Sequence, residues 1–390
     1  MHKKKIYFLI SHPIQYFSPL FKKLAEDESL DFMVLYCSDE NVKGHFDKQF
    51  GVTFAWDIPV LNGYNYNFLK NHSWKPSIYN GFFGLINFSL IKILKGNKDT
   101  ILIIHGWNRF TMILGLIIAK LRGIKVYLRA ENPFKQEIKK KKINILIKKI
   151  FLGQLIFPLF DKILYIGHQN KEFYRFYGVP EKKLIFTPYC IDNDRFLSYY
   201  KLNFQNKENL KVKLGLPLDH IIILFAGKFI SKKNPFDLLK AFEELNLGNV
   251  TLVMVGDGEL RKELESYVNT KEIRNIVFTG FKNQTEIPEY YLISDIFVLP
   301  SGIGETWGLV INEAMNFGLP IISSDLVGCS NDLVLHGKNG FIFQEGNINQ
   351  LSRYLKILVL NDDFRQEAGK LSADIISDYS YDKVIEGIVK

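Results

Sequence analysis

Cysteine is scarce in this chain, and long apolar runs are absent. Only three cysteines, Cys37, Cys190 and Cys329, occur among 390 residues, far apart and without the spacing of metal ligands. This usage argues against a disulfide framework and favours a reducing compartment. No run of eighteen uncharged apolar residues occurs, and the lysines of the N-terminus lead straight into an apolar segment. We therefore expect a cytoplasmic protein with neither a spanning helix nor a cleaved signal.

Three further motifs are missing, and each absence disfavours a class of function. No Gly-x-Gly-x-x-Gly follows the first apolar segment, which makes an NAD-dependent oxidoreductase the least favoured enzyme. No nucleic-acid-binding motif accompanies the positive charge, so no nucleic-acid partner is expected. Asp192 and Asp194 form an Asp-x-Asp pattern, but no second acidic cluster with oxygen-ligand spacing accompanies it. We therefore expect no metal and no cofactor.

The apolar residues that are present suffice for two cores, because they make up 47% of the chain. Strands are expected at 6–10, 31–36, 100–104, 125–128 and 162–166, with helices such as 19–26 and 112–121 between them. This alternation predicts an α/β fold with parallel, doubly wound sheets, and the second half repeats the plan from Ile221. The polar stretch 203–209, within 192–211, is interpreted as the linker.

Two carboxylates eight residues apart, Glu305 and Glu313, follow a strand-like run at 296–300. A glycine-containing loop comes first, and a helix is expected to begin near Trp307 or Gly308. A strand, a glycine loop and a helix N-terminus form a common anion site, because the N–H groups of 307–310 would face the ligand. A nucleotide diphosphate there would leave the two acids to accept hydrogen bonds from sugar and ribose hydroxyls. The alternative is a capped surface helix with two solvated acids.

The Glu305-x7-Glu313 motif, with Trp-Gly-Leu after the first acid and Glu-Ala-Met at the second, closely resembles the signature of the retaining, nucleotide-sugar-dependent glycosyltransferases of family 4. The resemblance implies a GT-B fold, in which two Rossmann-like domains face a cleft and the C-terminal helix crosses back to the N-terminal domain. Residues 1–195 with 376–390 would bind the acceptor, and 196–375 would bind the nucleotide sugar. In that family the first Glu contacts donor-sugar hydroxyls and the second holds the ribose.

A second segment, 220–242, resembles the family's Gly-Arg-x4-Lys-Gly stretch, whose cations clamp the diphosphate. Gly227 and Lys233 match, whereas Lys228 replaces the Arg and Asn234 replaces the Gly, so the bidentate fork is lost and the charge remains. Two cations there would stabilise the charge that grows as the glycosidic bond breaks. Weaker matches extend to a Gly-Asp-Gly turn and to a segment that meets the nucleobase. The implied donor-binding residues are Gly227, Lys228, Lys233, Gly256, Phe281, Lys282, Glu305, Thr306, Trp307, Gly308, Leu309 and Glu313.

Four side chains that follow strands of the first half are candidates for the acceptor side: His12, His105, Arg129 and Glu131. His12 lies in a His-Pro-Ile-Gln-Tyr form that resembles a subset of bacterial members, where many others have a glycine-rich loop. The alternatives are a structural role for His12 and an ion pair of Glu131 with Arg129 or a lysine. The candidate catalytic residues are Glu305, Lys233, Lys228, His12 and Glu131.

Charge is divided unevenly along the chain. Residues 1–195 hold 30 Lys and Arg against 16 Asp and Glu, whereas residues 196–390 hold 20 against 25. The densest basic stretch, 134–161, interleaves lysines with bulky apolar residues. One interpretation is a helix lying on an anionic membrane, which would make the protein peripheral on the inner face of the plasma membrane. The other is a solvated helix packed on its own domain.

Together these patterns predict a metal-independent, retaining glycosyltransferase that moves a sugar from a nucleoside-diphosphate sugar to a hydroxyl of a glycan or lipid-linked acceptor. Bacterial surface polysaccharide or lipopolysaccharide assembly is the expected setting. In the resembled family the departing phosphate is thought to take the acceptor proton, so no dedicated base is needed. Two alternatives stay open: a sugar-nucleotide epimerase with a GT-B fold, and a non-catalytic membrane-surface protein that binds sugars.

Overall fold

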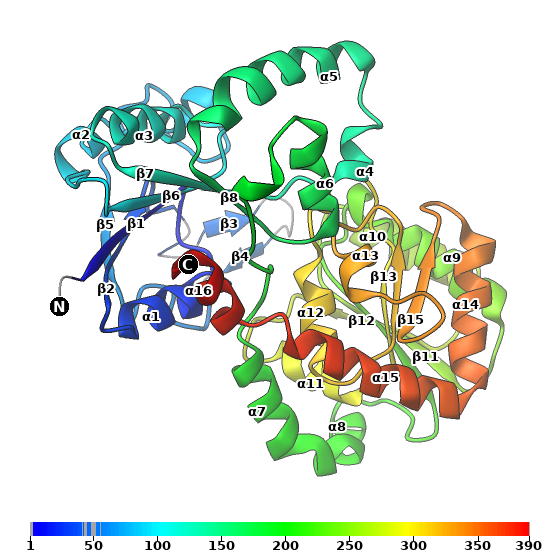
Figure 1. The fold of residues 1–390 in the computed structure, drawn as a ribbon. Coiled ribbons are helices and arrows are strands. Elements are labelled where there is room, and N and C mark those ends of the chain that lie inside the picture. The colour runs from blue at the N-terminus through cyan, green and yellow to red at the C-terminus, as the bar shows by residue number, and fades with distance from the viewer. Residues whose placement is uncertain (1–2, 41, 43–44, 48–51, 55, 390) are drawn as a thin grey trace. The chain divides into compact units, whose positions relative to one another are not determined.

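The computed structural model describes residues 3–40, 42, 45–47, 52–54 and 56–389 (Figure 1). The chain divides into two compact units. The first comprises Met1–His45, Ile58–Tyr189 and Tyr381–Lys390, and the second comprises Phe46–Asp57 and Cys190–Ser380. Met1, His2 and Lys390, which bound the predicted first domain, lie outside the described residues.

The first unit is built on a seven-stranded parallel sheet of order β5-β2-β1-β6-β7-β8-β9. Helices cover both faces, with α2, α3 and α5 on one side and α1 and α16 on the other (Figure 1). Strands buried on both faces read as continuous apolar runs, which is why the strand predictions succeeded. The strands are β1 (Lys4–Ile10), β2 (Leu30–Tyr36), β5 (Asn65–Phe68), β6 (Ile101–His105), β7 (Lys125–Arg129), β8 (Lys162–Tyr165) and β9 (Leu184–Phe186). The main helices are α1 (Ser18–Glu26), α2 (Leu90–Ile93), α3 (Phe110–Leu121), α4 (Phe134–Glu137), α5 (Lys142–Lys148), α6 (His168–Phe176) and α16 (Tyr381–Val389).

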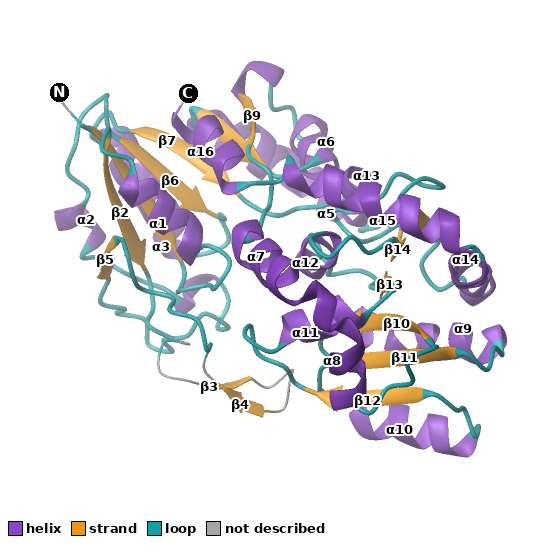
Figure 2. Cartoon of the chain, turned by 90° about the horizontal axis from the view of Figure 1, so that it is seen from below, coloured by secondary structure: helices purple, strands orange, loops and turns teal. Residues whose placement is uncertain are grey.

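The second unit contains a six-stranded parallel sheet of order β12-β11-β10-β13-β14-β15. Figure 2 shows β10, β11 and β12 lying side by side. A separate two-stranded sheet joins β3 (His45–Asp47) and β4 (Val52–Phe54). The large sheet comprises β10 (Ile221–Ala226), β11 (Val250–Val255), β12 (Ile276–Gly280), β13 (Ile296–Leu299), β14 (Ile321–Ser324) and β15 (Gly340–Phe343). Its helices are α7 (Asn193–Asn203), α8 (Lys207–Lys213), α9 (Pro235–Leu245), α10 (Arg261–Thr270), α11 (Ile287–Ile293), α12 (Leu309–Met315), α13 (Ser330–Leu333), α14 (Ile348–Leu360) and α15 (Asp362–Ser377).

The interpretation of 203–209 as a linker is wrong. This stretch lies at the end of α7 and the start of α8, within the second unit. Asp192 caps α7 by accepting a hydrogen bond from the Arg195 N–H at 3.1 Å, and Phe196 is fully buried. The Phe196 ring lies 6.3 Å from Tyr291 and 6.1 Å from Phe317, measured between centroids. The polar residues of this region resemble a linker in the sequence. In the structure, α7 is a helix that packs on the second unit through one buried aromatic side chain.

The last helix, α16, returns to the first unit, as the resemblance implied. The Tyr381 hydroxyl donates to the Tyr16 carbonyl at 2.9 Å. Gly387 lies so close to β9 that a Cβ there would be 2.7 Å from Thr187 Cγ2 and 2.8 Å from the Phe186 carbonyl oxygen. A side chain at this position would therefore push the helix off the sheet.

The basic segment 134–161 is not one helix. It forms α4, α5, the π-helical turn η2 (Lys149–Ile156) and the short 3-10 turn η3 (Phe157–Leu159). Glu137 ties α4 to α5, because its buried carboxylate accepts hydrogen bonds from Lys140 at 2.6 Å, from Lys148 at 2.7 Å and from the Tyr177 hydroxyl at 2.8 Å. Burial acts to raise the pKa of Glu137, but these three donors outweigh it and hold the pKa below its ordinary value.

Replacing Glu137 by glutamine should lower the stability of the first unit at neutral pH by about 2 kcal/mol, because two charge-assisted hydrogen bonds are weakened. A carboxyl with a depressed pKa stabilises the fold above its unfolded-state pKa, and loses that contribution as pH falls through the folded-state pKa. The difference between Glu137→Gln and wild type should therefore shrink as pH falls below about 4. Thermal unfolding from pH 3.5 to 7.5 measures this. A difference that did not change with pH would contradict the ion-pair explanation.

Within the described residues, no helix combines the length and the apolar composition that crossing a bilayer requires.

Candidate functional site

The two motifs of the second half meet at the point where the strand order of the second sheet reverses. From β10 the chain proceeds to β11 and β12 on one side, whereas β13, β14 and β15 continue on the other. The carboxyl ends of the strands at such a switch point open the crevice in which α/β sheets bind ligands. Gly227 and Lys228 follow β10, and Glu305 follows β13. Their placement at one sheet edge is therefore a consequence of topology.

A lysine cluster surrounds Glu305 at this edge. Lys233 forms a short ion pair with the Glu305 carboxylate, and the two side chains are only 13% and 12% exposed. Burial lowers the pKa of Lys232; the Glu305 carboxylate opposes that shift, while the charges of Lys233 and Lys228 add to it. Lys228, Lys232 and Lys233 thus lie within electrostatic reach of one another. We call these three residues the lysine cluster.

Lys232 was missed by the sequence analysis, which considered only Lys228 and Lys233, the two lysines aligned with the cations of the family pattern. The available signal was its position beside Lys233 in the 3-10 turn η6 (Ser231–Lys233), where adjacent residues can both face a ligand. Lys233 is paired with Glu305, and the charges of Glu305, Lys233 and Lys228 all act on Lys232, so positive charge is in local excess. Such an arrangement suits a multiply charged anion such as a diphosphate.

The loops after β10 and β13 are tied to each other through the main chain. The Gly302 N–H donates to the Lys232 carbonyl at 2.8 Å, and Asn234 Nδ2 donates to the Pro300 carbonyl at 3.2 Å. Glu345, which follows β15 and was not predicted, lies 3.4 Å from the Asn234 amide. A Cβ on Gly302 would be 2.5 Å from the Glu345 carboxylate. The lysine cluster and Glu305 are therefore held in a fixed relation before any ligand binds.

Asn234 replaces a glycine of the family pattern, and it can keep the backbone conformation that this glycine would adopt. Its φ and ψ are both 47°, the left-handed conformation that glycine adopts freely and that asparagine tolerates better than other residues. Asn234 therefore performs the conformational role of the glycine it replaces. It also supplies an amide that glycine lacks.

Substitutions at Asn234 should separate these two contributions. We expect Asn234→Gly to retain activity within about threefold of wild type, whereas Asn234→Val should destabilise the second unit by about 1–2 kcal/mol, because a β-branched residue is strained at positive φ. Melting temperature and turnover of the two variants measure this. Equal behaviour of the two variants would show that the left-handed conformation is not required.

Gly256 packs closely against the loop after β10, and its predicted contact with the donor stays a prediction. Its φ is 140°, and a Cβ would lie 1.9 Å from the Gly227 carbonyl oxygen. The next residue, Asp257, accepts a hydrogen bond at its carbonyl from the Phe229 N–H at 2.8 Å. The turn after β11 thus packs against the loop that contains Gly227 and Lys228 and supports its conformation.

The helix of the acidic motif begins later than expected. α12 starts at Leu309, with Gly308 at the N-cap in the left-handed region (φ 100°), so Trp307 lies outside the helix. The Trp307 indole is buried and donates to Asn312 Oδ1 at 2.9 Å. Its side chain is therefore part of the core, and any ligand contact from Trp307 would come from its main chain. Thr306 and Leu309 are half-buried beside it.

Glu313 lies on α12 and is 2% exposed, and it accepts a hydrogen bond from the Tyr291 hydroxyl at 2.6 Å. Its predicted contact with ribose stays a prediction. Phe281 and Lys282 follow β12, two strands from β10, and both are half-buried. Lys282 pairs with Glu286 at 3.3 Å. Their predicted place near a nucleobase is also untested.

The first unit has an equivalent switch point between β1 and β6, and the acceptor-side candidates gather there. His12 follows β1, with its Nδ1 2.9 Å from the Ser11 hydroxyl, and His105 ends β6. His105 Nε2 lies 3.5 Å from the Glu131 carboxylate, and the two side chains are 17% and 21% exposed. The structure therefore brings His105 together with Glu131, a pair that the sequence analysis did not propose.

Arg129 is buried and hydrogen-bonded in the first unit, and its predicted contact with the acceptor stays a prediction. It is 2% exposed, and its guanidinium donates to the Thr187 carbonyl at 2.9 Å, the Thr187 hydroxyl at 2.7 Å and the Pro188 carbonyl at 3.2 Å. The Tyr189 ring lies 5.7 Å from this guanidinium. Arg129 thus holds the segment after β9, because a buried guanidinium needs acceptors for its donors.

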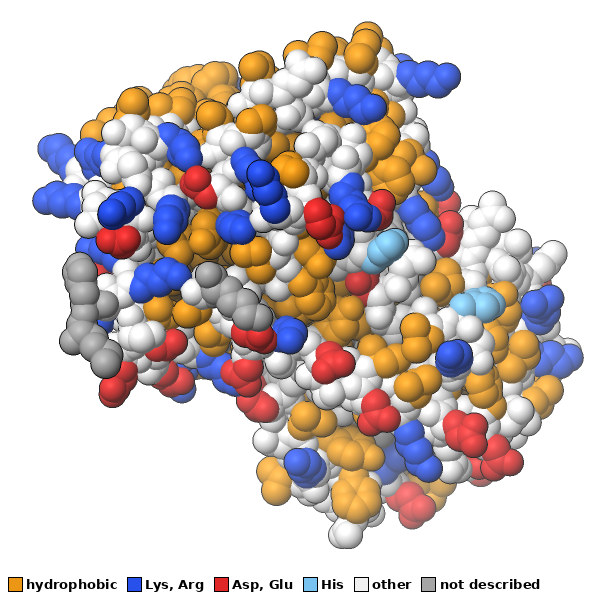
Figure 3. All heavy atoms as spheres, in the orientation of Figure 1, with side chains coloured by type: hydrophobic (Ala, Val, Ile, Leu, Met, Phe, Trp, Pro, Cys, Tyr) orange, Lys and Arg blue, Asp and Glu red, His pale blue; other side chains and the backbone are white. Residues whose placement is uncertain are grey.

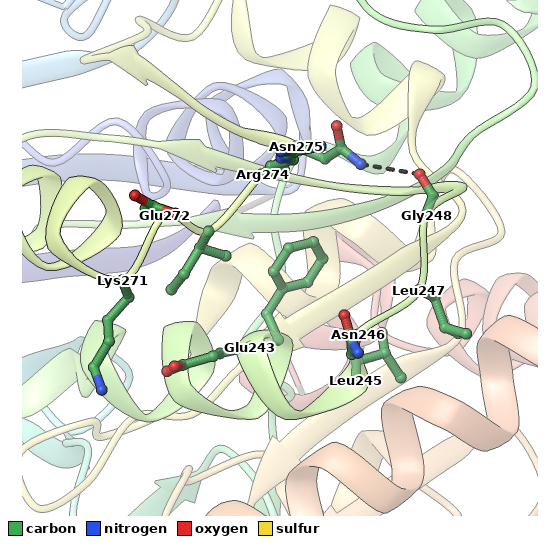
Figure 4. Close-up of a pocket in the computed structure, with 11 residues that line it drawn as sticks. Glu243, Leu245, Asn246, Leu247, Gly248, Lys271, Glu272, Arg274 and Asn275 are labelled. Atoms are coloured by element: carbon green, nitrogen blue, oxygen red, sulfur yellow. Dashed lines mark hydrogen bonds between the residues drawn. The ribbon is translucent and has the colours of Figure 1, made fainter.

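A pocket of about 390 Å³ in the second unit is not this site (Figure 4). It is lined by residues 242–248 and 271–275, which precede β11 and β12, so it lies at the amino ends of the strands. Asn275 donates to the Gly248 carbonyl at 3.0 Å beside it. The lysine cluster lies at the opposite edge of the sheet, where the strands end.

Comparison with known proteins identifies the family. Residues 206–373 match the family described as Glycosyl transferases group 1. The UDP-Gal:alpha-D-GlcNAc-diphosphoundecaprenol alpha-1,3-galactosyltransferase of Escherichia coli is 30% identical over 284 residues, which is 70% of each chain. The chain belongs to the group 1 glycosyl transferases. This glycosyltransferase is also 24% identical over 306 residues to the lipopolysaccharide 1,2-N-acetylglucosaminetransferase of Salmonella typhimurium, over 74% of this chain and 71% of that protein.

Solved structures show that the glycosyltransferase has the GT-B fold. Anabaena HepE in complex with UDP and glucose superposes with a TM-score of 0.73 at 16% identity, covering 99% of this chain and 98% of that one. A glycosyltransferase from Rickettsia africae gives a TM-score of 0.74 at 15% identity, covering 100% and 97%. The predicted architecture of two Rossmann-like domains is confirmed.

Proposed function

We propose that this glycosyltransferase is a retaining, metal-independent enzyme that transfers a sugar from a nucleoside-diphosphate sugar to a hydroxyl of a glycan or lipid-linked acceptor. The observation that carries the proposal is the lysine cluster around Glu305 at the switch point of the second sheet. Relatives favour the same substrates, since the Escherichia coli relative is named for UDP-Gal and a diphosphoundecaprenol acceptor. HepE was crystallised with UDP-glucose. Assembly of a bacterial surface glycan is the setting we propose.

The Lys233–Glu305 ion pair would then be exchanged for contacts with the donor. An arriving diphosphate competes for Lys233, and Glu305 becomes able to accept hydrogen bonds from hydroxyls of the donor sugar. Both side chains are nearly buried, so each keeps a partner of opposite charge or a hydrogen-bond donor in either state. Main-chain groups of 306–309 would contact the phosphates. Glu313 would receive the ribose, and Phe281 and Lys282 would lie beside the base.

In the proposed reaction, the bond between the anomeric carbon and the diphosphate oxygen breaks and a bond from the acceptor oxygen to that carbon forms on the same face. The acceptor proton passes to the departing diphosphate. Lys228, Lys232 and Lys233 stabilise the negative charge that develops on this leaving group. On the acceptor side, His12 and the His105–Glu131 pair would position the hydroxyl.

Metal chelation should leave the reaction unchanged, because the lysine cluster supplies the positive charge that a divalent ion supplies in metal-dependent transferases. We expect turnover in excess EDTA to stay within about twofold of turnover with added Mg²⁺. The control is a metal-dependent glycosyltransferase assayed in the same buffer. A loss that Mg²⁺ restores would contradict metal independence.

The proposal is tested first by thermal unfolding with a panel of nucleoside diphosphates. A nucleotide at 100 times its dissociation constant should add about 2.7 kcal/mol to the stability of the second unit. Transfer is then measured with the matching nucleotide sugar and a short-chain, water-soluble acceptor, following nucleotide release and the anomeric configuration of the product. Stabilisation by none of the nucleotides would refute the donor site. Isomerisation of donor alone would establish the epimerase alternative, and an inverted product would overturn retention.

We also propose that the enzyme works in the cytoplasm at the inner face of the plasma membrane. All three cysteines are buried and none is in a disulfide, which suits a reducing compartment. A lipid-linked acceptor would require access to a membrane surface.

A further inference from the structure

An apolar stripe faces away from the first unit along α5 and η2. Five of its side chains recur at helical spacing and are between 51% and 57% exposed: Ile143, Leu146, Ile147, Ile150 and Leu155. None of the seven residues of α5 is buried, and the first buried residue after it is Leu152 in η2. An amphipathic helix normally turns such a stripe toward a core. Here the stripe is exposed to solvent. The segment that carries it is held to α4 by the hydrogen bonds that Lys140 and Lys148 donate to Glu137.

The surroundings of this stripe carry almost no negative charge. Residues 138–156 include six lysines and no acidic residue, and residues 58–160 include 17 lysines and arginines against three acids, Asp99, Glu131 and Glu137. Glu137 is buried in its ion pairs, and Glu131 lies beside His105. The charge carried by α5 and η2 themselves is therefore entirely positive, which suits an anionic partner.

Further exposed apolar side chains lie on the same helix layer. Figure 3 shows hydrophobic side chains gathered along the upper edge over α2, α3 and α5, with lysines and arginines below them. Trp74 is 71% exposed and Tyr79 is 72% exposed in the loop before α2, and Leu121 is 83% exposed at the end of α3. Arg109 holds that loop by donating to the Gly81 carbonyl at 2.7 Å and the Ile78 carbonyl at 2.6 Å. Tryptophan and tyrosine are the side chains that favour a membrane–water interface.

We propose that the outer face of α5 and η2 seats the enzyme on an anionic lipid surface. The apolar stripe would enter the boundary between headgroups and acyl chains, and the lysines would contact lipid phosphates. A second copy of the chain is a poorer occupant, because a symmetric contact would bring two strongly basic surfaces together. The proposal deepens the proposed function, since it rests on an acceptor held in a membrane, but the binding itself can be measured without any substrate.

Co-sedimentation of the full chain with vesicles tests the proposal. Vesicles of phosphatidylglycerol and phosphatidylcholine are compared with vesicles of phosphatidylcholine alone, at low and high salt. We expect binding to the anionic vesicles that is at least about tenfold stronger than to neutral ones and that weakens with salt, because each lysine near the surface adds about fivefold to partitioning. Equal binding to both kinds of vesicle, or binding to neither, would overturn the proposal. A dimer in solution together with no vesicle binding would assign the stripe to a second copy instead.

Two sets of variants measure separately how the apolar stripe and the lysine charge contribute to vesicle binding. Leu146→Glu with Ile150→Glu removes apolar area, and Lys139→Ser with Lys141→Ser and Lys142→Ser removes charge while sparing the Glu137 ion pairs. Matched controls in the second unit are Leu202→Glu with Leu360→Glu, at 79% and 63% exposure, and a triple exchange of Lys201, Lys262 and Lys271 to Ser. We expect at least about a tenfold loss of vesicle binding in both stripe variants and less than about twofold in the controls. Equal losses in variants and controls would refute the assignment.

Nucleotide binding and transfer to the soluble acceptor distinguish this proposal from the proposed function. Both should be unchanged in the stripe variants, because the substituted residues lie in the first unit on the outer side of its helix layer. If the wild type binds anionic vesicles yet is stabilised by no nucleotide, the surface assignment stands and the donor site fails. If nucleotides bind but vesicles do not, the surface assignment fails alone.

Discussion

Replacing Lys233 by alanine is expected to lower kcat by about 10²–10³-fold, the range found when one preorganised partner of a developing anion is removed. Lys233 is nearly buried and is paired with Glu305. In the proposed reaction it exchanges that carboxylate for the leaving diphosphate. Because its interaction grows as the diphosphate departs, the loss should fall more on kcat than on KM.

The variant should remain folded. Lys232 stays within electrostatic reach of Glu305, so the carboxylate does not lose all of its positive surroundings. We expect the melting temperature to fall by less than about 5 °C. Lys240→Ala is the matched control, since Lys240 is exposed on α9, and it should keep wild-type turnover. Wild-type turnover in purified Lys233→Ala would show that the lysine cluster does not hold the leaving group.

A double-mutant cycle with Glu305→Ala examines the pair itself. Each single change should cut turnover by orders of magnitude, and the double variant should be little worse than either, because residues that act as a unit are strongly non-additive. The comparison is made with kcat/KM for the same donor and the same soluble acceptor. Additive losses would mean that the two side chains act separately.

Replacing Gly256 by alanine is the second large effect, because a side chain at this position would displace the backbone beside it. A Cβ would lie 1.9 Å from the Gly227 carbonyl oxygen, and the φ of 140° is strained for any residue with a side chain. Either the β11 turn or the loop carrying Lys228 must move. We expect a loss of about 3 kcal/mol or more in the stability of the second unit, and a fall in turnover of at least about 100-fold in the protein that remains folded.

Gly248→Ala provides the control for Gly256→Ala. Gly248 lies in the loop before β11, with open space around the position of a Cβ. Its substitution should leave turnover and melting temperature near those of the wild type, and the backbone entropy effect can even be mildly stabilising. If Gly256→Ala behaved like Gly248→Ala, the close approach to Gly227 would not be needed for activity.

Elements of the fold could be predicted from the sequence where the residues of the element itself carry a clear apolar pattern. Parallel strands buried on both faces were found because their apolar runs are continuous, as in β1 and β6. The edge strand β5, Asn65–Phe68, was missed because its residues are mostly exposed and polar. The segment 203–209 was misread because one buried phenylalanine, Phe196, anchors a helix whose other residues are largely polar.

In the candidate site too, positions set by local patterns could be predicted, and contacts between distant residues could not. The positions of Lys233 and Glu305 could be predicted from strand–loop–helix patterns, because the carboxyl ends of parallel strands share one edge. The burial of Trp307 and Arg129 could not, since it depends on partners such as Asn312 and Thr187 that only the folded chain brings near. Lys232 and the His105–Glu131 contact likewise emerged only from the packing of neighbouring loops.

The return of α16 to the first unit has a consequence for biosynthesis. β9 ends at Phe186, whereas its covering helix begins at Tyr381, so almost the whole second unit is translated in between. The surfaces of α1 and β9 that receive α16 must stay uncovered on the ribosome during that interval. Such a nascent chain exposes hydrophobic surface on an incomplete domain, which makes it prone to aggregation. A chaperone that covers this surface would raise the yield of native enzyme.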